Sequence, residues 1–575
     1  MIKDQIQAII TAAVNKISTR STVHIQSPDN PQFGDYTTNI AMRLAKELKK
    51  NPLQMAEEIA KQIPKDEIIE KVEVVKPGFI NFWLTKETLS KNLIQILSNI
   101  NNYGKSETTR GKKIIVEYSS PNIAKPFTIG HLRSTIIGDA IANLLEAAGW
   151  TVFRDNHLGD WGTQFGKQIY AIKTWGNIGK IEKMQQPVKE LVRLYVKFHK
   201  EAEKNPEIEE QGKIWFKKLE DGNEEARILW QKCIDWSWKE FNEIYDKLQV
   251  TFTENDGKGY GESFFEDKMD FIIKELQNKK LLTKSKGAQI IAFPRDKYPP
   301  LMILKDDGAT LYSTRDLATD KFRLTNSHYS ADVLIINEVG AEQSLYFQQL
   351  FEAEKMLGWV KDNQRVHVKH GMYRFKDKKM STRKGNVIWL EEVLEEAKKR
   401  AESLSKQHQT DATVSQSYHD NANIIGIGAL KWNDLKRSAN MDILFDWDEI
   451  LNMQGNAGPY MQYTYVRCRS VISKSNFSPK NKLPRIDYQA EELELMRMLE
   501  KYPSIVESAA VNMAPNLLCN YLFTLAQQYN LFYQKHPILK ADQDTKNFRL
   551  ALTTAVAQVI KNGLYLLGIQ TVEKM

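Results

Sequence analysis

The stretch KKIIVEYSSPNIAKPFTIGHLRSTIIGD, residues 112–139, predicts a strand, a loop and a helix in that order. Its first residues form a short apolar run with β-branched side chains, and two prolines interrupt its middle. The last part has helical character and begins near Gly130 and His131. In open α/β sheets, ligands bind beyond the carboxyl ends of strands, where a helix N-terminus offers free N–H groups to an anion. This loop is therefore the first candidate for a nucleotide-phosphate site.

Three residues of the loop have chemistry that suits a phosphate. Gly130 would let a ligand approach the backbone, His131 could donate a ring N–H, and Lys125 would add a mobile positive charge. A glycine–histidine pair also occurs at ordinary helix N-termini. A helix cap beside a surface lysine therefore stays open as the alternative.

A second cationic loop, RFKDKKMSTRKGNVIWL at residues 374–390, follows the strand-like RVHVKHGMY. It combines four cations with small and hydroxyl residues: Lys378, Lys379, Arg383 and Lys384 with Ser381, Thr382 and Gly385. Charge repulsion favours a mobile loop unless an anion binds there. The sequence indicates a phosphate clamp, with a solvated charge run as the alternative.

The rest of the chain divides into four predicted parts. Residues 1–108 contain two helical patterns and the strand-like VEVVKPGFINFWL, which predict a small α/β domain. In 109–375, strand signals alternate with helices, as in parallel βαβ units; the strand signals are KIIVEYS, TVFRDNH, AQIIAFP, DVLIINEV and RVHVKHGMY. Charged helical sequence interrupts this alternation at about 167–285, and we interpret it as an insertion. Residues 376–445 contain the second loop and a connecting region, and 446–575 predict a helical domain.

The helical C-terminal part contains LLCNYLFTLAQQYNLFYQK at residues 517–535. Four of its apolar residues lie near helical spacing and favour a core stripe: Leu517, Tyr521, Leu525 and Phe532. We predict that Tyr529 and Tyr533 are the more exposed aromatic residues of this helix.

The composition excludes several classes of protein. At 575 residues, the chain should form roughly three or four domains. Cys233, Cys468 and Cys519 lie far apart, which argues against a disulfide framework and a structural zinc site. No long apolar run or signal peptide is present, so we expect a cytoplasmic protein without a membrane segment. The net charge of +8 is compatible with a polyanionic partner.

The two loops carry a family resemblance. TIGH at 128–131 and KMSTR at 379–383 are similar to H-I-G-H and K-M-S-K-S, the signature motifs of class I aminoacyl-tRNA synthetases. Four longer runs resemble the arginyl-tRNA synthetases: SSPNIAKPFTIGHLRSTIIGD, HLGDWGTQFG, LYSTRDLAT and GNAGPYMQYTYVR. The resemblance covers essentially the whole chain. It implies a Rossmann-like parallel-sheet catalytic domain, an N-terminal α/β tRNA-binding domain and an all-helical C-terminal anticodon-binding domain.

Two positions depart from the family motifs. Thr128 replaces the first histidine of H-I-G-H, and its hydroxyl can form a hydrogen bond but carries no charge. Thr382 stands where K-M-S-K-S has its second lysine. Arginyl enzymes often lack that lysine and commonly carry one in the loop before H-I-G-H, which matches Lys125.

The resemblance implies that arginine is activated with ATP to arginyl-adenylate and then transferred to the 3′-terminal ribose of tRNA(Arg). The catalytic residues that it implies are Lys125, Thr128, Gly130, His131, Lys379, Ser381, Arg383 and Lys384. Those for arginine are Glu117, Ser119, Asn122, His157, Tyr312, Asp316 and Gln343, and ATP would also contact Gly371, Met372 and Met380. From the residues alone, Asp316 could equally cap a helix. The tRNA contacts implied are Phe79, Asn81, Tyr460, Tyr529 and Tyr533.

We expect Mg²⁺ to be held mainly by the ATP phosphates, because the sequence shows no dense carboxylate cluster, and we expect no tightly bound cofactor and no protein metal site. A monomer is expected. Two other functions stay open: a small-molecule nucleotidyltransferase with a similar glycine–histidine loop, and a non-catalytic tRNA-binding paralogue. Pyrophosphate exchange into ATP, measured with each amino acid, would discriminate among the three.

Overall fold

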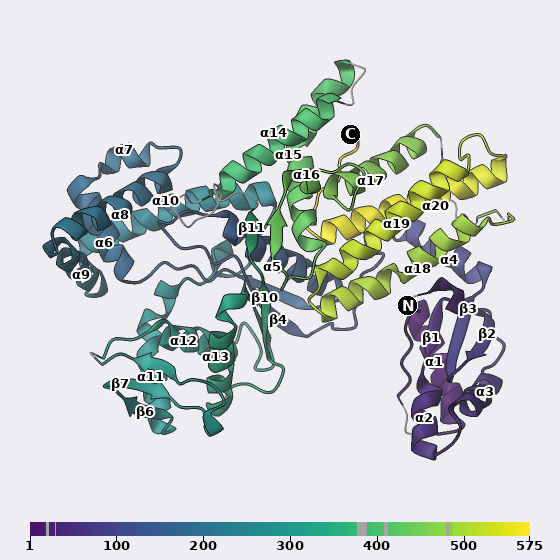
Figure 1. The fold of residues 1–575 in the computed structure, drawn as a ribbon, viewed down its shortest axis with the longest axis horizontal. Coiled ribbons are helices and arrows are strands. Elements are labelled where there is room, and N and C mark those ends of the chain that lie inside the picture. The colour runs from purple at the N-terminus through teal and green to yellow at the C-terminus, as the bar shows by residue number, and fades with distance from the viewer. Residues whose placement is uncertain are drawn as a thin grey trace.

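The computed structural model describes residues 1–18, 22–28, 30–306, 308–375, 388–407, 412–475, 477–478, 483–484 and 486–575, with the backbone alone at residues 31, 404–407 and 412–420. A parallel sheet lies near the middle of the molecule, with helices on several sides (Figure 1). The N-terminal α/β unit lies beside the C-terminal helices (Figure 1).

The central sheet has four parallel strands in the order β10-β9-β4-β5. Their bounds are Arg365–His370, Leu334–Gly340, Lys113–Glu117 and Thr151–Asp155. β4 leads through a loop into helix α5 (Ile129–Ala147), which confirms the strand, loop and helix predicted for residues 112–139. The Thr128 hydroxyl caps α5 by accepting the Gly130 N–H at 3.2 Å. The parallel βαβ pattern is thus confirmed for these four strands.

The strand predicted at AQIIAFP forms, but in another sheet. It is β7 (Ala288–Ile291), which pairs antiparallel with β6 (Leu282–Ser285) and β8 (Leu301–Leu304). Its assignment to a parallel βαβ unit was wrong, because strand composition does not determine pairing direction. Lys286 and Gly287 both have positive φ, which makes the tight turn of an antiparallel hairpin.

Helices fill most of the chain between β5 and β9, on the left of Figure 1. They are α6 (Thr163–Trp175), α7 (Ile178–Glu182), α8 (Pro187–Lys204), α9 (Glu207–Glu220), α10 (Glu224–Leu248), α11 (Met269–Asn278) and α12 (Tyr312–Thr325). Asn223 caps α10, the longest of them, by accepting the Ala226 N–H. The helix α13 (Ser344–Met356) then connects β9 to β10.

The N-terminal unit is a three-stranded antiparallel sheet with helices. Its elements are α1 (Ile2–Asn15), β1 (Tyr36–Thr38), α2 (Ile40–Leu48), α3 (Pro52–Gln62), β2 (Ile69–Val75), β3 (Phe79–Leu84) and α4 (Lys86–Ser98), with sheet order β1-β3-β2. The run GDYTTNIAMRLAKEL at residues 34–48 is one of the two helical patterns of this part, but its helix begins only at Ile40, because residues 36–38 pair with β3. The Tyr36 hydroxyl donates to Glu500 at 2.8 Å and joins this unit to the C-terminal helices.

The C-terminal part is helical, as predicted. After β10 come β11 (Tyr373–Phe375), α14 (Leu390–Gln407), α15 (Ala412–Leu435), β12 (Ile443–Phe445), α16 (Trp447–Ile450), α17 (Gly458–Ser473), α18 (Ala490–Val511), α19 (Pro515–Lys535) and α20 (Gln543–Leu566). Tyr533 is 40% exposed, but Tyr529 is fully buried, so its predicted exposure was wrong. Tyr529 lies four residues after Leu525, on the same helical face as the core stripe.

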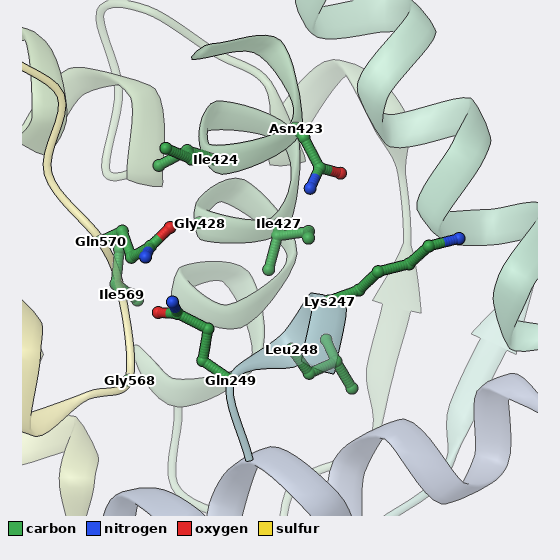
Figure 2. A pocket seen from close by; sticks show the side chains of 10 residues that line it. All are labelled: Lys247, Leu248, Gln249, Asn423, Ile424, Ile427, Gly428, Gly568, Ile569 and Gln570. Carbon is green, nitrogen blue, oxygen red and sulfur yellow. The ribbon is translucent and has the colours of Figure 1, made fainter. Parts of the chain in front are cut away.

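A small cavity of about 20 Å³ marks the seam where α10, α15 and the C-terminal residues meet (Figure 2). Lys431 of α15 holds this seam by donating to the Leu248 carbonyl at 2.6 Å and the Gly568 carbonyl at 2.7 Å. The ammonium group thereby satisfies the carbonyl at the end of one helix and a carbonyl of the C-terminal segment. Every helix among the described residues is too short or too polar to span a lipid bilayer.

Candidate active site

A cavity of about 440 Å³ lies at the carboxyl ends of β4, β5 and β9, beside α12 and α13. The structure brings six of the predicted arginine-binding residues to its lining: Glu117, Asn122, His157, Tyr312, Asp316 and Gln343. They come from four separate segments of the chain: residues 117–122, 157, 312–316 and 343. This is the edge of a parallel sheet at which α/β proteins bind ligands.

One face of α12 supplies much of the lining. The residues that point to the cavity are Tyr312, Asp316, Thr319, Asp320 and Arg323, at helical spacings of three and four. Sequence reasoning identified the first two and missed the others. The signal was present, because a polar stripe with helical period on a mostly buried helix indicates that the stripe faces a polar site.

We call Glu117, Asp155, Arg323 and Asn337 the pocket floor. The Arg323 guanidinium lies 2.5 Å from Glu117 and 2.7 Å from Asp155, and the Asn337 amide donates to Glu117 at 3.0 Å. Burial would raise the pKa of Glu117, but Arg323, with smaller contributions from His157 and Asn337, lowers it to about 2. Glu117 is therefore ionised and already paired with a cation of the protein.

We call Asp316, Tyr346 and His157 the pocket wall. The Tyr346 hydroxyl donates to Asp316, whose carboxylate is 3.8 Å from His157 Nε2 and 25% exposed. Burial raises the pKa of Asp316 to about 6, although His157 and the Tyr346 hydrogen bond oppose it. Asp316 is thus a partly exposed carboxylate without a guanidinium or ammonium partner among the described residues.

His157 completes the pocket wall. Its Nδ1 lies 2.9 Å from the Tyr260 carbonyl, which can only accept, so Nδ1 carries a proton. Its Nε2 is buried and has no hydrogen-bond partner among the described residues. Burial lowers the pKa of His157, but Glu117 and Asp316 outweigh that effect and raise it. The ring therefore contributes partial positive charge next to Asp316.

The lining carries more negative than positive charge. Its carboxylates are Glu117, Glu262, Asp316, Asp320 and Glu342. On the cationic side, the described lining has Arg323 and the titratable His157. A ligand with a planar, charged donor group would balance this excess, because carboxylates accept paired N–H bonds from a guanidinium.

Ser119 does not line the cavity, contrary to the expectation from the resemblance. Its side chain is buried, and its hydroxyl lies 2.8 Å from those of Thr135 and Tyr245, whereas Ser120 lines the cavity. Both serines have positive φ, which ends the strand alternation after Glu117 and turns the next side chain toward the cavity. Sequence spacing does not reveal such a turn.

The N-terminus of α5 presents a neutral histidine. The Thr128 N–H donates to His131 Nδ1 at 3.0 Å, so the ring proton of the neutral form is on Nε2. Burial lowers the pKa of His131 to about 4. Lys125 donates to Gln164 at 3.3 Å, and burial lowers its pKa while Glu262 opposes that shift. The Nε2–H of His131 and the lysine thus accompany the positive end of the helix dipole.

The flank of the second cationic loop lies directly against the first loop. The Ile129 N–H donates to the Ile388 carbonyl at 3.1 Å, and the Leu390 N–H donates to the Phe127 carbonyl at 2.9 Å. Thr128 and Trp389 form a β-bridge between them. The predicted residues Lys379, Met380, Ser381, Arg383 and Lys384 lie outside the described residues, as does Thr382. Gly371 and Met372 lie before the loop, between β10 and β11, and Met372 is exposed.

The residues predicted to contact tRNA differ in exposure. Phe79 is half-buried at the start of β3, but Asn81 is buried and accepts the Thr37 hydroxyl at 2.7 Å. Tyr460 is also half-buried, and its hydroxyl accepts from Asn530 at 2.9 Å. Arg467, which the sequence analysis did not single out, lies over the exposed Tyr533 ring at 5.2 Å.

Three family models match successive parts of the chain. The arginyl-tRNA synthetase N-terminal domain matches residues 2–84, the class I (R) tRNA synthetase catalytic domain matches 92–447, and the DALR anticodon binding domain matches 461–575. Together these matches span nearly all of the chain, and the catalytic-domain match alone covers more than half of it.

Known proteins are similar over the full length. The chain is 42% identical to an arginine–tRNA ligase of Clostridium perfringens, over 96% of each chain, and 38% identical to that of Halothermothrix orenii, over 100% of this chain and 99% of the other. The arginyl-tRNA synthetase structure of Plasmodium falciparum superposes with a TM-score of 0.82 at 26% identity and covers 100% of this chain and 99% of that one. This chain therefore belongs to the arginyl-tRNA synthetase family, within the class I aminoacyl-tRNA synthetases.

Proposed function

We propose that this chain activates arginine with ATP and transfers the arginyl group to tRNA(Arg). One observation carries the proposal: a single loop runs from Glu117, at the carboxylate-rich cavity, to Thr128, at the N-terminus of α5. A guanidinium bound in the cavity and a phosphate bound at the helix would therefore lie at the two ends of one short segment. That is the arrangement needed to bring an arginine carboxylate to a nucleotide phosphate.

In the first step, an oxygen of the arginine carboxylate attacks the α-phosphorus of ATP. A bond forms between them, the bond to the β-phosphate oxygen breaks, and pyrophosphate leaves. The step needs no nucleophilic side chain. We assign guanidinium recognition to Asp316, and stabilisation of the developing phosphate charge to His131 Nε2–H, Lys125 and the positive end of the α5 dipole, with Gly130 leaving room for the phosphate. Lys379, Arg383 and Lys384 of the second loop are proposed to act on the same phosphates.

In the second step, a hydroxyl of the terminal tRNA ribose attacks the arginyl carbonyl carbon, and AMP leaves. We propose that residues 1–108 and 446–575, which lie beside each other, bind the tRNA that reaches a catalytic part formed by 109–375 and 376–445. Phe79, Tyr460 and Tyr533 are the proposed contact residues. Asn81 would act by holding β3 in place, because its side chain is buried against Thr37.

Mg²⁺ is proposed to enter with ATP, bound mainly by the phosphates. A monomeric state and a cytoplasmic location also stay predictions, the first of which sedimentation analysis would test. The non-catalytic paralogue is disfavoured, because the cavity and the α5 N-terminus retain the groups that the reaction requires.

The test is pyrophosphate exchange into ATP with each amino acid, with and without tRNA. We expect arginine to be the only amino acid that supports exchange. Lys125→Ala should lower kcat by about 100-fold with a smaller change in KM for arginine, because a lysine at the phosphates acts mainly in the transition state. Lys361→Ala, at an exposed ion pair with Asp332, is the matched control and should leave exchange unchanged. Exchange with another amino acid would contradict the assignment.

A further inference from the structure

A buried arginine connects the start of α5 to a distant part of the chain. Arg133 lies two residues after His131, and its side chain is 1% exposed. Its Nε donates to the Asp434 carboxylate at 3.2 Å, Nη1 to the Met441 carbonyl at 2.8 Å, and Nη2 to the Ala439 carbonyl at 3.1 Å. All three nitrogens of the guanidinium thus bind the end of α15 and the segment after it.

The same carboxylate holds β11. Asp434 is fully buried, and it also accepts the Tyr373 hydroxyl at 2.6 Å. Tyr373 is the first residue of β11, which pairs in parallel with β12. One carboxylate therefore joins a residue at the start of α5 to the strand that follows Gly371 and Met372.

The segment bound by Arg133 also fixes Gly371 and Met372. The Gly371 N–H donates to the Ala439 carbonyl at 2.9 Å, and the Met372 N–H donates to Asp442 at 2.7 Å. A Cβ at position 371 would lie 2.6 Å from the Met441 carbonyl carbon, so the two backbones touch where only glycine fits. Ala439 thus accepts from both Arg133 and Gly371.

A buried ion pair contributes little net stability, because desolvation offsets the attraction, although loss of one partner leaves an unpaired buried charge. We propose that Arg133 and Asp434 are positioning residues of the nucleotide site: they set the distance between the α5 N-terminus and the Gly371–Met372 segment, and ATP binds between the two. This inference deepens the proposed function and rests on it, together with the expectation from the family resemblance that ATP contacts both segments. It predicts that the pair controls ATP use and leaves arginine recognition at Asp316 unaffected.

The test compares Arg133→Lys and Asp434→Asn with the wild type. Lysine keeps the charge but cannot bind three acceptors in the plane of a guanidinium, and asparagine keeps the shape without the charge. We expect KM for ATP to rise about tenfold and kcat of exchange to fall, with KM for arginine unchanged within about twofold. Reduced folding alone would lower the active fraction and kcat but would leave KM for ATP unchanged.

Arg549→Lys is the matched control. Arg549 is also buried, donating to Glu492 at 2.7 Å and to the Pro537 carbonyl at 2.7 Å, but it lies in the C-terminal helices. Arg549→Lys should lower the melting temperature by about as much as the two test variants do, and it should leave KM for ATP unchanged. If the two test variants do not fold, Tyr373→Phe removes only the hydrogen bond to Asp434 and should raise KM for ATP by about threefold.

Calorimetric titration with ATP alone separates this inference from the proposed function. A wild type that supports exchange with no amino acid would refute the proposed function. Weaker ATP binding in the variants would still support the positioning role. ATP affinity and KM that match those of Arg549→Lys would overturn the positioning role, whatever the exchange activity of the wild type.

Discussion

The pocket floor and the pocket wall place the same functional group in opposite electrostatic environments. On the floor, Glu117 lies 2.5 Å from the Arg323 guanidinium, and its pKa is lowered to about 2. On the wall, Asp316 has a tyrosine hydroxyl and a histidine as neighbours, and burial raises its pKa to about 6. Of these two carboxylates of one cavity, Glu117 is paired with a guanidinium, and Asp316 has no such partner among the described residues.

The difference assigns separate roles to the two carboxylates. Glu117 is neutralised within the protein, so a ligand gains little from a second guanidinium contact there, and the residue mainly fixes the ends of β4 and β5 relative to α12. Asp316 is held partly desolvated and has no such partner among the described residues, so an entering guanidinium would restore its favoured charged state. Selectivity for arginine should therefore reside on the wall, and four predictions follow in decreasing order of expected effect.

The largest effect is expected for Asp316→Asn. Asparagine has nearly the same shape but no charge, so a bound guanidinium would lack its ionic partner. Losses for buried pairs are roughly 3 to 5 kcal/mol, which corresponds to a decrease in kcat/KM for arginine of a few hundredfold or more. Steady-state exchange with tRNA present measures it, together with melting temperature and ATP affinity, both of which should stay near the wild-type values.

Asp332→Asn is the control for the loss of one aspartate charge, because Asp332 is exposed and pairs with Lys361 at the surface. It should leave arginine use unchanged. Asp316 is the fifth residue of α12, so the structure rules out the helix-capping alternative. If Asp316 only stabilises the fold, its Asn variant would lose stability and retain arginine selectivity, and Glu117 would become the residue to test for recognition.

The second prediction concerns the floor. Glu117→Gln removes one of the carboxylates around Arg323, which keeps Asp155 at 2.7 Å and Asp320 at 3.3 Å. The free energy of unfolding should therefore fall by about 1 to 3 kcal/mol, less than for an ion left without any partner. Denaturant unfolding measures this change. An arginine defect larger than the stability defect would reverse the roles of floor and wall.

The third prediction is a pH dependence of arginine binding. Because the pKa of Asp316 is about 6 in the free protein, arginine affinity should fall about tenfold per pH unit below pH 6 and level off above it. The stability of the free protein has the opposite pH dependence. The folded state binds this proton more tightly than the unfolded chain does, so the contribution of Asp316 to the free energy of unfolding increases as the pH falls from about 6 to about 4.

Calorimetric titrations of arginine between pH 5 and 8, together with melting curves of the free protein, measure both signs. His157 binds a proton more readily than an ordinary histidine, because Glu117 and Asp316 outweigh its burial and raise its pKa. Asp332→Asn should retain the slope. A pH-independent affinity in the wild type would show that Asp316 is already charged at pH 5.

Much of this fold was predictable from the sequence, because its signals are local. The apolar run of β4, the prolines and the Thr128 cap all lie within residues 112–139, and the structure has the predicted strand, loop and helix there. The pairing of β7 was not predictable from its composition, since parallel and antiparallel strands have similar residues. In the structure, the hairpin is formed by the turn at Lys286 and Gly287, both of which have positive φ.

The site was predictable where the chain carries recognisable motifs, and less so where distant segments meet. Asp316 and His131 lie in such motifs. Glu262 and Tyr346 reach the cavity from separate helical segments, and no local pattern marks them as neighbours of Asp316. Ser119 lies outside the cavity lining because two consecutive positive-φ residues replace strand alternation with a turn. Contacts of this kind depend on tertiary packing.

The smallest effect, and the sharpest test of the wall, is expected for Tyr346→Phe. Its hydroxyl donates to Asp316 and opposes the rise of that pKa, so its removal should raise the pKa further. One hydrogen bond contributes about 0.5 to 1.5 kcal/mol, so arginine affinity at pH 7 should weaken by no more than about tenfold. The titrations described above for the pH dependence measure the change.

The direction of the shift matters more than its size. Without the hydroxyl, the midpoint of the pH dependence should move upward, so the defect should be larger at pH 6 than at pH 8, where Asp316 is ionised in both proteins. Tyr298→Phe, on another segment beside Lys297, controls for the loss of a tyrosine hydroxyl and should leave the midpoint unchanged. A defect independent of pH would mean that Tyr346 contacts arginine directly, and that its hydroxyl does not act through the charge of Asp316.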